Sequence, residues 1–273
     1  MAAAAPPGAR GSAAGYREAV FGLLGALTLA AWLALWLWQQ SPYARFLEHG
    51  DWSDAGLLAS LCRALPGGGF LVPAALYAGG WALMTAAMML PTVFPLLEMF
   101  QRLTRERGDR GRLLAAVVAG YLGVWLLFGL GAHALDWGLH RAAAASAWLT
   151  FNGWALGAAA IALAGAFQFS ALKYRCLDKC RSPLSFVIEH WRGYAPLRHA
   201  FLLGAHHGVF CVGCCWALML LMFALGTGNL GWMLALAAVM AAEKTLRWGR
   251  HLAKPLGAAL LAWAGAILLA NAI

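Results

Sequence analysis

Charged side chains are scarce in this chain. Aspartate, glutamate, lysine and arginine make up 11% of its 273 residues, whereas 62% of the residues are hydrophobic. An average soluble domain is roughly 25% charged, so the few charges here would leave most of a soluble globule uncovered. We therefore expect an integral membrane protein. The net charge of +9 does not indicate nucleic acid binding, because basic loops in membrane proteins usually set the topology.

Sequence motifs of several common enzyme classes are also absent. The chain has no Walker P-loop, no Gly-x-Ser-x-Gly elbow and no His-Glu-x-x-His pair. The first absence excludes ATP hydrolysis through a P-loop, and the others argue against the hydrolases that those motifs mark. An enzyme is therefore not our first interpretation. Alternating polar and apolar residues, which a membrane barrel requires, are missing too, so we predict an all-α fold.

Seven apolar stretches are candidates for membrane-spanning helices, which need roughly 20 residues each. They lie at about 19–38, 71–97, 113–132, 147–172, 201–225, 230–246 and 255–272. The first stretch resembles a signal peptide, but it exceeds the usual apolar core of about 7–15 residues, and we interpret it as a retained span. Residues 1–18 are predicted to form a disordered tail. Residues 19–273 are predicted to form a single membrane helix-bundle domain.

The distribution of lysine and arginine orients this seven-helix bundle. Most of the 20 basic residues fall near the N-terminus or in segments 102–112, 173–198 and 244–254, all on one side of the predicted bundle. The positive-inside rule places that side in the cytoplasm. We therefore predict a cytoplasmic N-terminus, an external C-terminus and a cytoplasmic loop at 173–200. The expected location is the lipid bilayer of a bacterial inner membrane, which the chain crosses several times.

Five of the six cysteines form two short clusters. Cys176 and Cys180 lie in KYRCLDKCRSP, and Cys211, Cys214 and Cys215 lie in HHGVFCVGCCWALM. Helical spacing places the first pair on one face, and a helical wheel places the other three within about a 100° arc. Both clusters fall near the predicted cytoplasmic face, where thiols stay reduced. We therefore expect the two clusters to meet.

The second cluster shares its helical stripe with His207 and Met222. Thiolates and thioethers are soft ligands that suit copper(I) or zinc, and four thiolates, or three with a histidine, would fill a tetrahedral site. We predict a site for a copper-type or zinc-type ion. Its candidate ligands are Cys176, Cys180, Cys211, Cys214, Cys215 and His207. Cysteine also serves as a small packing residue in membrane helices, and this alternative stays open.

Methionines and charged residues on other spans could form a metal pathway beside this site. Met84, Met88 and Glu98 share a helical face with Pro91 and Pro95. The two prolines should kink their helix and free backbone carbonyl groups, which must then be satisfied by protein or water. Methionine in apolar helices is also a common packing residue, so a pathway and simple packing both stay open.

The fifth and sixth predicted spans supply the remaining pathway candidates. These are Met222, Met233, Met240, Glu243 and Lys244. Lys244, Lys173 or Arg175 could offset the negative charge of a thiolate site. Alternatively, Glu243 and Lys244 form an interfacial pair that reaches water.

Three segments resemble a bacterial family described as predicted metal-binding integral membrane proteins of unknown function. The segments are WALMTAAMMLPTVFPL, ALKYRCLDKCRSPLSF and HHGVFCVGCCWALMLLMFALGTGNLGWMLALAAVMAAEKTL, in this order over roughly residues 80–250. The resemblance implies a membrane protein that binds metal, and it strengthens the assignment of the cysteine site. It implies no particular metal, substrate or reaction.

These observations favour metal transport or metal handling at the membrane. A soluble metal carrier or a second membrane protein would be the partner. Two alternatives remain. The spacing of Cys211 and Cys214 is similar to that of thiol–disulfide oxidoreductases, with Cys176 and Cys180 as the second pair. A metal could also act as a structural staple in a protein of other function.

Overall fold

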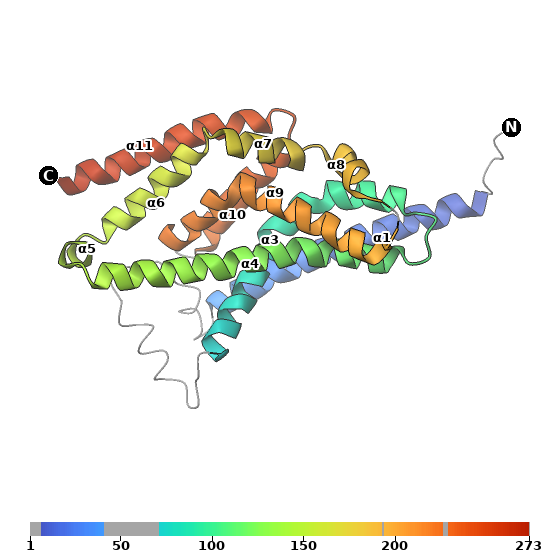
Figure 1. Ribbon diagram of the computed structural model, residues 1–273, viewed down its shortest axis with the longest axis horizontal. Coiled ribbons are helices and arrows are strands. Elements are labelled where there is room, and N and C mark those ends of the chain that lie inside the picture. The colour runs from blue at the N-terminus through green and yellow to red at the C-terminus, as the bar shows by residue number, and fades with distance from the viewer. Residues whose placement is uncertain (1–6, 41–70, 193, 226–228, 273) are drawn as a thin grey trace.

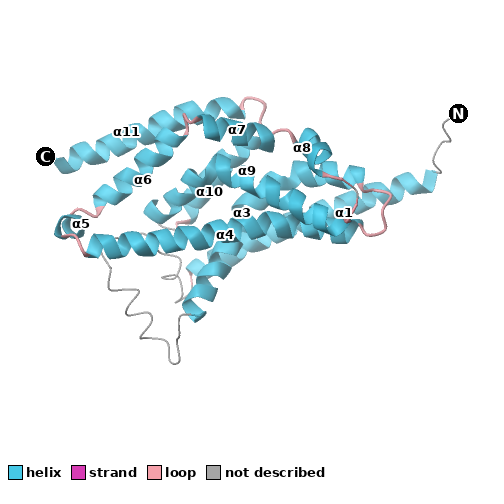
Figure 2. Ribbon diagram, viewed as in Figure 1, coloured by secondary structure: helices cyan, strands magenta, loops and turns pink. Residues whose placement is uncertain are grey.

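A computed structural model describes residues 7–40, 71–192, 194–225 and 229–272 of the chain (Figure 1). This part of the chain is all-helical, which confirms the predicted fold class (Figure 2). Its elements are α1 (Pro7–Gln39), α3 (Leu71–Leu103), α4 (Arg110–Ala144), α5 (Ala147–Phe151), α6 (Trp154–Phe167), α7 (Ala171–Cys180), α8 (Pro183–His190), α9 (Pro196–Leu225), α10 (Leu230–Thr245), the 3₁₀ helix η2 (Gly249–Leu252) and α11 (Ala253–Ala272).

Five of the described helices are long and apolar enough to cross a membrane. The candidate spans are Glu18–Gln39, Tyr77–Leu103, Arg110–Ala143, Pro196–Met222 and Gly249–Asn271. A sixth candidate is the pair formed by α6 and α7, which are bent by 65° relative to each other. The length and composition of these helices are those of a multi-pass membrane protein.

The stretch 230–246, which we predicted as a span, is shorter than the others. It forms α10, whose 16 residues extend only about 24 Å at 1.5 Å per residue. The hydrocarbon core of a bilayer is roughly 30 Å thick, so α10 alone falls short of it. The count of seven spans and the orientation of the bundle stay predictions.

The predicted boundaries differ from the described helices in three places. The stretch 147–172 is divided into α5, α6 and the start of α7. The break between α6 and α7 occurs where the Ser170 hydroxyl accepts a hydrogen bond from the Lys173 amide and begins a new helix. The predicted loop 173–200 contains α7 and α8. Helix α1 begins at Pro7, within the predicted tail 1–18, and continues through alanines that favour helix. The sixth cysteine, Cys62, belongs to neither cluster and lies outside the described residues.

Helix α3 contains the two predicted proline interruptions, Pro91 and Pro95. Proline has no amide hydrogen, so Pro91 cannot donate to the carbonyl of Ala87 one turn earlier. The indole nitrogen of Trp32, on α1, donates to this carbonyl instead, at 3.1 Å. The expected free carbonyl is therefore present, and α1 satisfies it.

Two aromatic side chains of α3 bind backbone carbonyls of α4. The Tyr77 hydroxyl donates to Gly129 at 3.1 Å, and the Trp81 indole nitrogen donates to Trp125 at 2.8 Å. All four residues lie in apolar segments, where an unsatisfied polar group would be costly. These bonds therefore fix the lengthwise position of α3 against α4.

Helices α4 and α9 make the most extensive helix–helix contact in the described structure, and glycine sets their separation. A Cβ atom at Gly204 of α9 would lie 1.9 Å from the carbonyl oxygen of Val117. A Cβ atom at Gly120 of α4 would lie 2.1 Å from the carbonyl oxygen of Phe201. Small residues let membrane helices approach this closely. This contact brings the middle of α4 against the part of α9 that carries three cysteines.

Candidate metal site

Helix α7 packs against α9 (Figure 1), and the two cysteine clusters of the sequence lie on these two helices. Cys176 and Cys180 belong to α7, and Cys211, Cys214 and Cys215 belong to α9. All five are buried, and all five are free cysteines. We call this group the thiol cluster. Side chains of α4 and α10 also contact the thiol cluster.

The α7 cysteines contact the α9 cysteines at two points. The Cys180 thiol interacts with the thiols of Cys211 and Cys214. The Cys176 sulfur lies over Gly213, where an added Cβ atom would be only 2.6 Å away from it. Gly213 therefore leaves the space that the Cys176 side chain occupies. The glycine in the motif CVGCC thus has a packing role that its sequence position alone does not reveal.

Within α9, the cysteines are held by hydrogen bonds to the helix backbone. The thiols of Cys214 and Cys215 both donate to the carbonyl oxygen of Cys211, at 3.1 and 2.9 Å. This i−3 and i−4 bonding turns both thiols toward the Cys211 end of the stripe. These two bonds hold the Cys214 and Cys215 side chains close to the backbone of Cys211.

Cys211 is the most densely contacted thiol of the cluster. Its sulfur lies 3.0 Å from the Tyr121 hydroxyl of α4 and 2.9 Å from the Lys244 ammonium nitrogen of α10. Lys244 is only 8% exposed. The positive charge of this ammonium is therefore directed at the Cys211 sulfur. The site therefore combines a soft donor with a buried positive charge.

The Lys244 nitrogen has further neighbours on α3 and α9. It lies 3.8 Å from the Met89 sulfur, 3.9 Å from the Cys215 sulfur and 3.4 Å from the Thr92 hydroxyl oxygen. Within the described residues, no carboxylate forms an ion pair with Lys244. Sulfur and hydroxyl groups, rather than a carboxylate, therefore surround this ammonium.

The neighbouring Glu243 is engaged elsewhere. Both of its carboxylate oxygens accept hydrogen bonds from Lys173 of α7 at 2.8 Å, and both side chains are almost completely buried. The Lys173 nitrogen also donates to the side-chain oxygen of Gln168. Glu243 and Lys244 are therefore not an interfacial pair that reaches water. Each points to a different helix, and Lys173, which we considered for charge compensation, neutralises Glu243 instead.

His207 is buried one turn before Cys211. Its ring lies 5.2 Å from the Phe186 ring of α8 and 6.0 Å from the Tyr121 ring, measured between centroids. Its Nδ1 atom has no hydrogen-bond partner among the described residues. The structure therefore places His207 beside the thiol cluster with one nitrogen available.

The predicted pathway residues divide into two groups. Five methionines belong to the same buried hydrophobic core as the thiol cluster: Met84, Met88, Met222, Met233 and Met240. Glu98 is not in this group, because its carboxylate accepts a hydrogen bond from Arg102 at 2.7 Å and lines a groove between α1 and α3. The structure therefore does not bring Glu98 to the thiols.

Sequence reasoning missed four residues that contact the site or its ion pair: Met89, Thr92, Tyr121 and Gln168. Tyr121 was detectable as a polar group in an otherwise apolar stretch. The segment GAHHG carried a second signal, because Gly204 and Gly208 have the spacing of a helix-packing motif. That motif indicates a close neighbour for α9, although it does not identify α4.

An exposed ion pair joins α7, which carries two of the cysteines, to α8. Lys179 of α7 donates to Glu189 of α8 at 2.9 Å. This hydrogen bond and the lysine charge lower the pKa of the Glu189 carboxyl. Surface pairs of this kind add little stability, so we assign it only a role in orienting α8.

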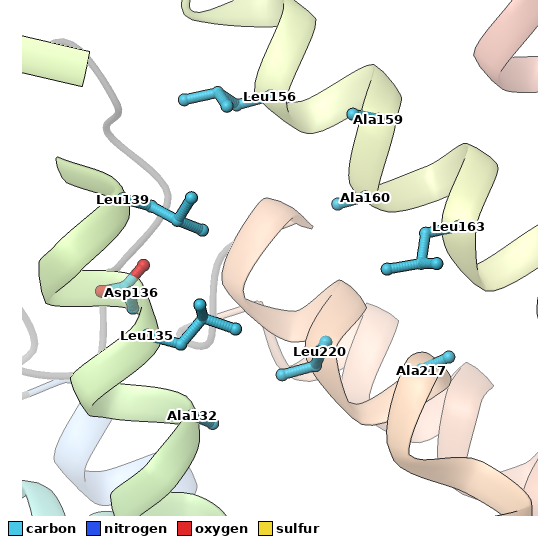
Figure 3. Close-up of a pocket in the computed structure, with 10 residues that line it drawn as sticks. All are labelled: Ala132, Leu135, Asp136, Leu139, Leu156, Ala159, Ala160, Leu163, Ala217 and Leu220. Carbon is cyan, nitrogen blue, oxygen red and sulfur yellow. The ribbon is translucent and has the colours of Figure 1, made fainter. Parts of the chain in front are cut away.

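A separate apolar pocket lies between α4, α6 and α9 (Figure 3). Its volume is about 240 Å³, and its walls are Ala132, Leu135, Asp136, Leu139, Leu156, Ala159, Ala160, Leu163, Ala217 and Leu220. Ala217 follows Cys215 by two residues, so the pocket begins close to the thiol cluster on α9. Its walls carry no sulfur atom, so it offers no soft ligand and is distinct from the candidate metal site.

The thiols as placed do not form a complete polydentate site. Among the described residues, no group of three or more His, Cys, Asp or Glu side chains is arranged so that it could hold a metal ion. The predicted tetrahedral site of four thiolates therefore stays a prediction. A site of fewer sulfur ligands needs less rearrangement.

Comparison with known proteins gives one match. Residues 78–267 match a family model described as PpoB2, copper chaperone. The matched region contains the whole thiol cluster, together with Tyr121 and Lys244. Neither the curated proteins nor the solved structures give a match.

Proposed function

The chain belongs to the PpoB2 copper chaperone family, and we propose that it binds copper(I) through the thiol cluster and passes the ion to a partner protein. The observation that carries this proposal is the convergence of five buried, free cysteines from α7 and α9. Thiolates and thioethers select soft ions such as copper(I) over magnesium, calcium or manganese. Copper is the cargo of this site.

Two arguments favour copper(I) over zinc. A structural zinc ion takes four ligands in a tetrahedral arrangement, and the described His, Cys, Asp and Glu residues supply no such group. Copper(I) accepts low coordination numbers, so a pair of thiolates with a thioether is sufficient. The family description supports the same ion.

The gradient of exposure across the cluster supports a route for the ion. Cys176 and Cys180 are 7% and 8% exposed, whereas each α9 cysteine is 1% exposed. Thiolate ligands exchange a soft ion by forming a new bond before an old one is lost. A donor would therefore load the α7 pair first, and the ion would then move to the α9 thiols.

The test is a copper titration of the purified protein in detergent under anaerobic conditions, against a chelator that reports copper(I). We expect the wild-type chain to retain copper after desalting, measured by mass spectrometry of the metal. The triple variant C211S/C214S/C215S should lose it. The matched control is C62S, which removes the cysteine outside both clusters. Equal copper in the triple variant and the wild type would overturn the proposal.

The same preparations address the oxidoreductase alternative. An oxidoreductase must form a disulfide during turnover, whereas a copper site works with reduced thiols throughout. Alkylation after exposure to oxidised glutathione counts the thiols that remain. We expect copper(I) to protect the cluster from oxidation. Rapid formation of a disulfide between Cys211 and Cys214, together with a lack of bound copper, would instead favour the oxidoreductase.

A further inference from the structure

We propose that the Lys244 ammonium occupies a copper(I) position in the copper-free protein and that loading displaces it. The position is the three-sulfur site formed by Cys211, Cys215 and Met89. This inference rests on the proposed function, since it concerns how the same cargo enters the thiol cluster. It assigns a ligand, Met89, and an internal competitor, Lys244.

The geometry places one cation among three sulfur atoms. The Lys244 nitrogen lies 2.9 Å from the Cys211 sulfur, 3.9 Å from the Cys215 sulfur and 3.8 Å from the Met89 sulfur. These sulfurs come from α9 and α3, so they approach the nitrogen from different helices. Two thiolates and a thioether are a ligand set that suits copper(I).

The charge balance explains why the ammonium lies there. A buried ammonium is costly unless other groups compensate its charge. The adjacent carboxylate, Glu243, is bound to Lys173, and the described residues give Lys244 no carboxylate of its own. The Cys211 sulfur, as a thiolate, compensates the charge, and the Thr92 hydroxyl accepts a hydrogen bond from the ammonium. The site therefore attracts a positive charge even before copper arrives.

Copper(I) and the ammonium cannot share this space. A metal–thiolate bond is roughly 2.3 Å long for a comparable ion, so copper bound to Cys211 would lie where the nitrogen now is or directly against it. Two positive charges at such a distance repel strongly in a buried site. The lysine side chain has a flexible four-carbon stem and can move away. α10 ends at Thr245 and the next residues are exposed, so the ammonium can reach water there.

This competition gives the site a means of release. A copper chaperone must bind its ion selectively and still transfer it. An ammonium that returns to the sulfurs would favour departure of copper to a partner, and it would keep the empty site compact.

The experiment measures the copper(I) dissociation constant by chelator competition in wild type, Lys244→Leu and Lys244→Arg. We expect the leucine variant to bind at least about tenfold more tightly, a difference easily resolved by competition, because the competing cation is gone. The arginine variant, which keeps a cation, should bind no more tightly than wild type. Lys254→Leu is the matched control, since it removes an exposed lysine of α11, and its affinity should not change.

A milder pair of variants covers the case in which Lys244→Leu does not fold. Thr92→Val removes the hydroxyl that contacts the ammonium, so copper should bind more tightly than in wild type. Thr85→Val is the matched control on the same helix, because its buried hydroxyl has no hydrogen-bond partner among the described residues. Thr85→Val should leave the affinity unchanged.

The outcomes separate this proposal from the copper-binding proposal. Suppose that wild type binds copper, and that Lys244→Leu and Thr92→Val bind it with equal or lower affinity. This result would overturn the displacement and leave the copper site standing. Binding by Lys244→Leu but not by wild type would support displacement in its strongest form. Absence of copper from every variant would overturn both.

Discussion

The Tyr121 hydroxyl of α4 lies 3.0 Å from the sulfur of Cys211 on α9. The same hydroxyl donates to the carbonyl oxygen of Met89 on α3 at 3.2 Å. One side chain thus connects the central thiol of the candidate site to both neighbouring helices. The contact depends on the close packing of α4 and α9, which glycine permits.

Removal of the Tyr121 hydroxyl should weaken both the fold and the site. Tyr121→Phe removes the contact with Cys211 and one of two side-chain hydrogen bonds to the Met89 carbonyl, which Thr92 still satisfies, so the cost is that of a typical hydrogen bond, about 0.5–1.5 kcal/mol. We expect a lower unfolding temperature in detergent and weaker copper(I) binding. Tyr174→Phe is the control, because its buried hydroxyl has no hydrogen-bond partner among the described residues. An equal effect of both substitutions would show that the contact to Cys211 is unimportant.

The glycine contact between α4 and α9 gives a second prediction. Gly204→Ala places a Cβ atom 1.9 Å from the Val117 carbonyl oxygen, so the helices must separate, at a cost of about 1–3 kcal/mol. We expect a lower unfolding temperature and loss of copper, because Cys211 moves away from Tyr121. Gly123→Ala on α4 meets no atom within 4 Å and should be neutral or stabilising by up to about 1 kcal/mol. A neutral Gly204→Ala would contradict the close packing.

The buried pair of Lys173 and Glu243 should be sensitive to loss of one partner. Lys173→Met leaves an unpaired carboxylate in the core, which destabilises a protein by about 3–5 kcal/mol. The double variant K173M/E243L removes both charges and should recover most of that loss. Thermal unfolding of the two variants in detergent tests this. A double variant no more stable than Lys173→Met would show that the unpaired Glu243 carboxylate is not the cause of the loss.

The predicted orientation can be tested by labelling in intact cells. In a C62S background, Ala142→Cys near the end of α4 should react with a membrane-impermeant maleimide. Ser185→Cys on α8 should react only after the membrane is permeabilised, because the positive-inside rule places α8 in the cytoplasm. Both positions are exposed in the structure. The reverse pattern would invert the topology and move the thiol cluster to the oxidising side.

The sequence predicted the helical stretches well, because the length and hydropathy of a segment depend only on that segment. It also predicted that the prolines of α3 would free a backbone carbonyl, which Trp32 satisfies. The break after Phe167 was less visible. It depends on the local hydrogen bond of Ser170, which competes with continuation of an apolar helix.

Of the site, the sequence predicted the cysteines, His207 on the same helical face, and Lys244 as a positive charge beside the thiols. The spacing of the cysteines is a property of one helix, and it indicates which thiols share a face. The separate roles of Glu243 and Lys244 are not visible in the same way, because consecutive helical residues point about 100° apart and meet different helices. Lys173 meets Glu243, and Met89 and Thr92 meet Lys244. Such pairings depend on helix arrangement, which a single sequence does not specify.

X-ray absorption at the copper edge of the loaded wild-type protein tests the copper site most directly. We predict the edge of copper(I), a first shell made of sulfur alone, and loss of that signal in the variant C211S/C215S. A first shell of nitrogen or oxygen, or an unchanged spectrum in C211S/C215S, would contradict copper binding by the thiol cluster.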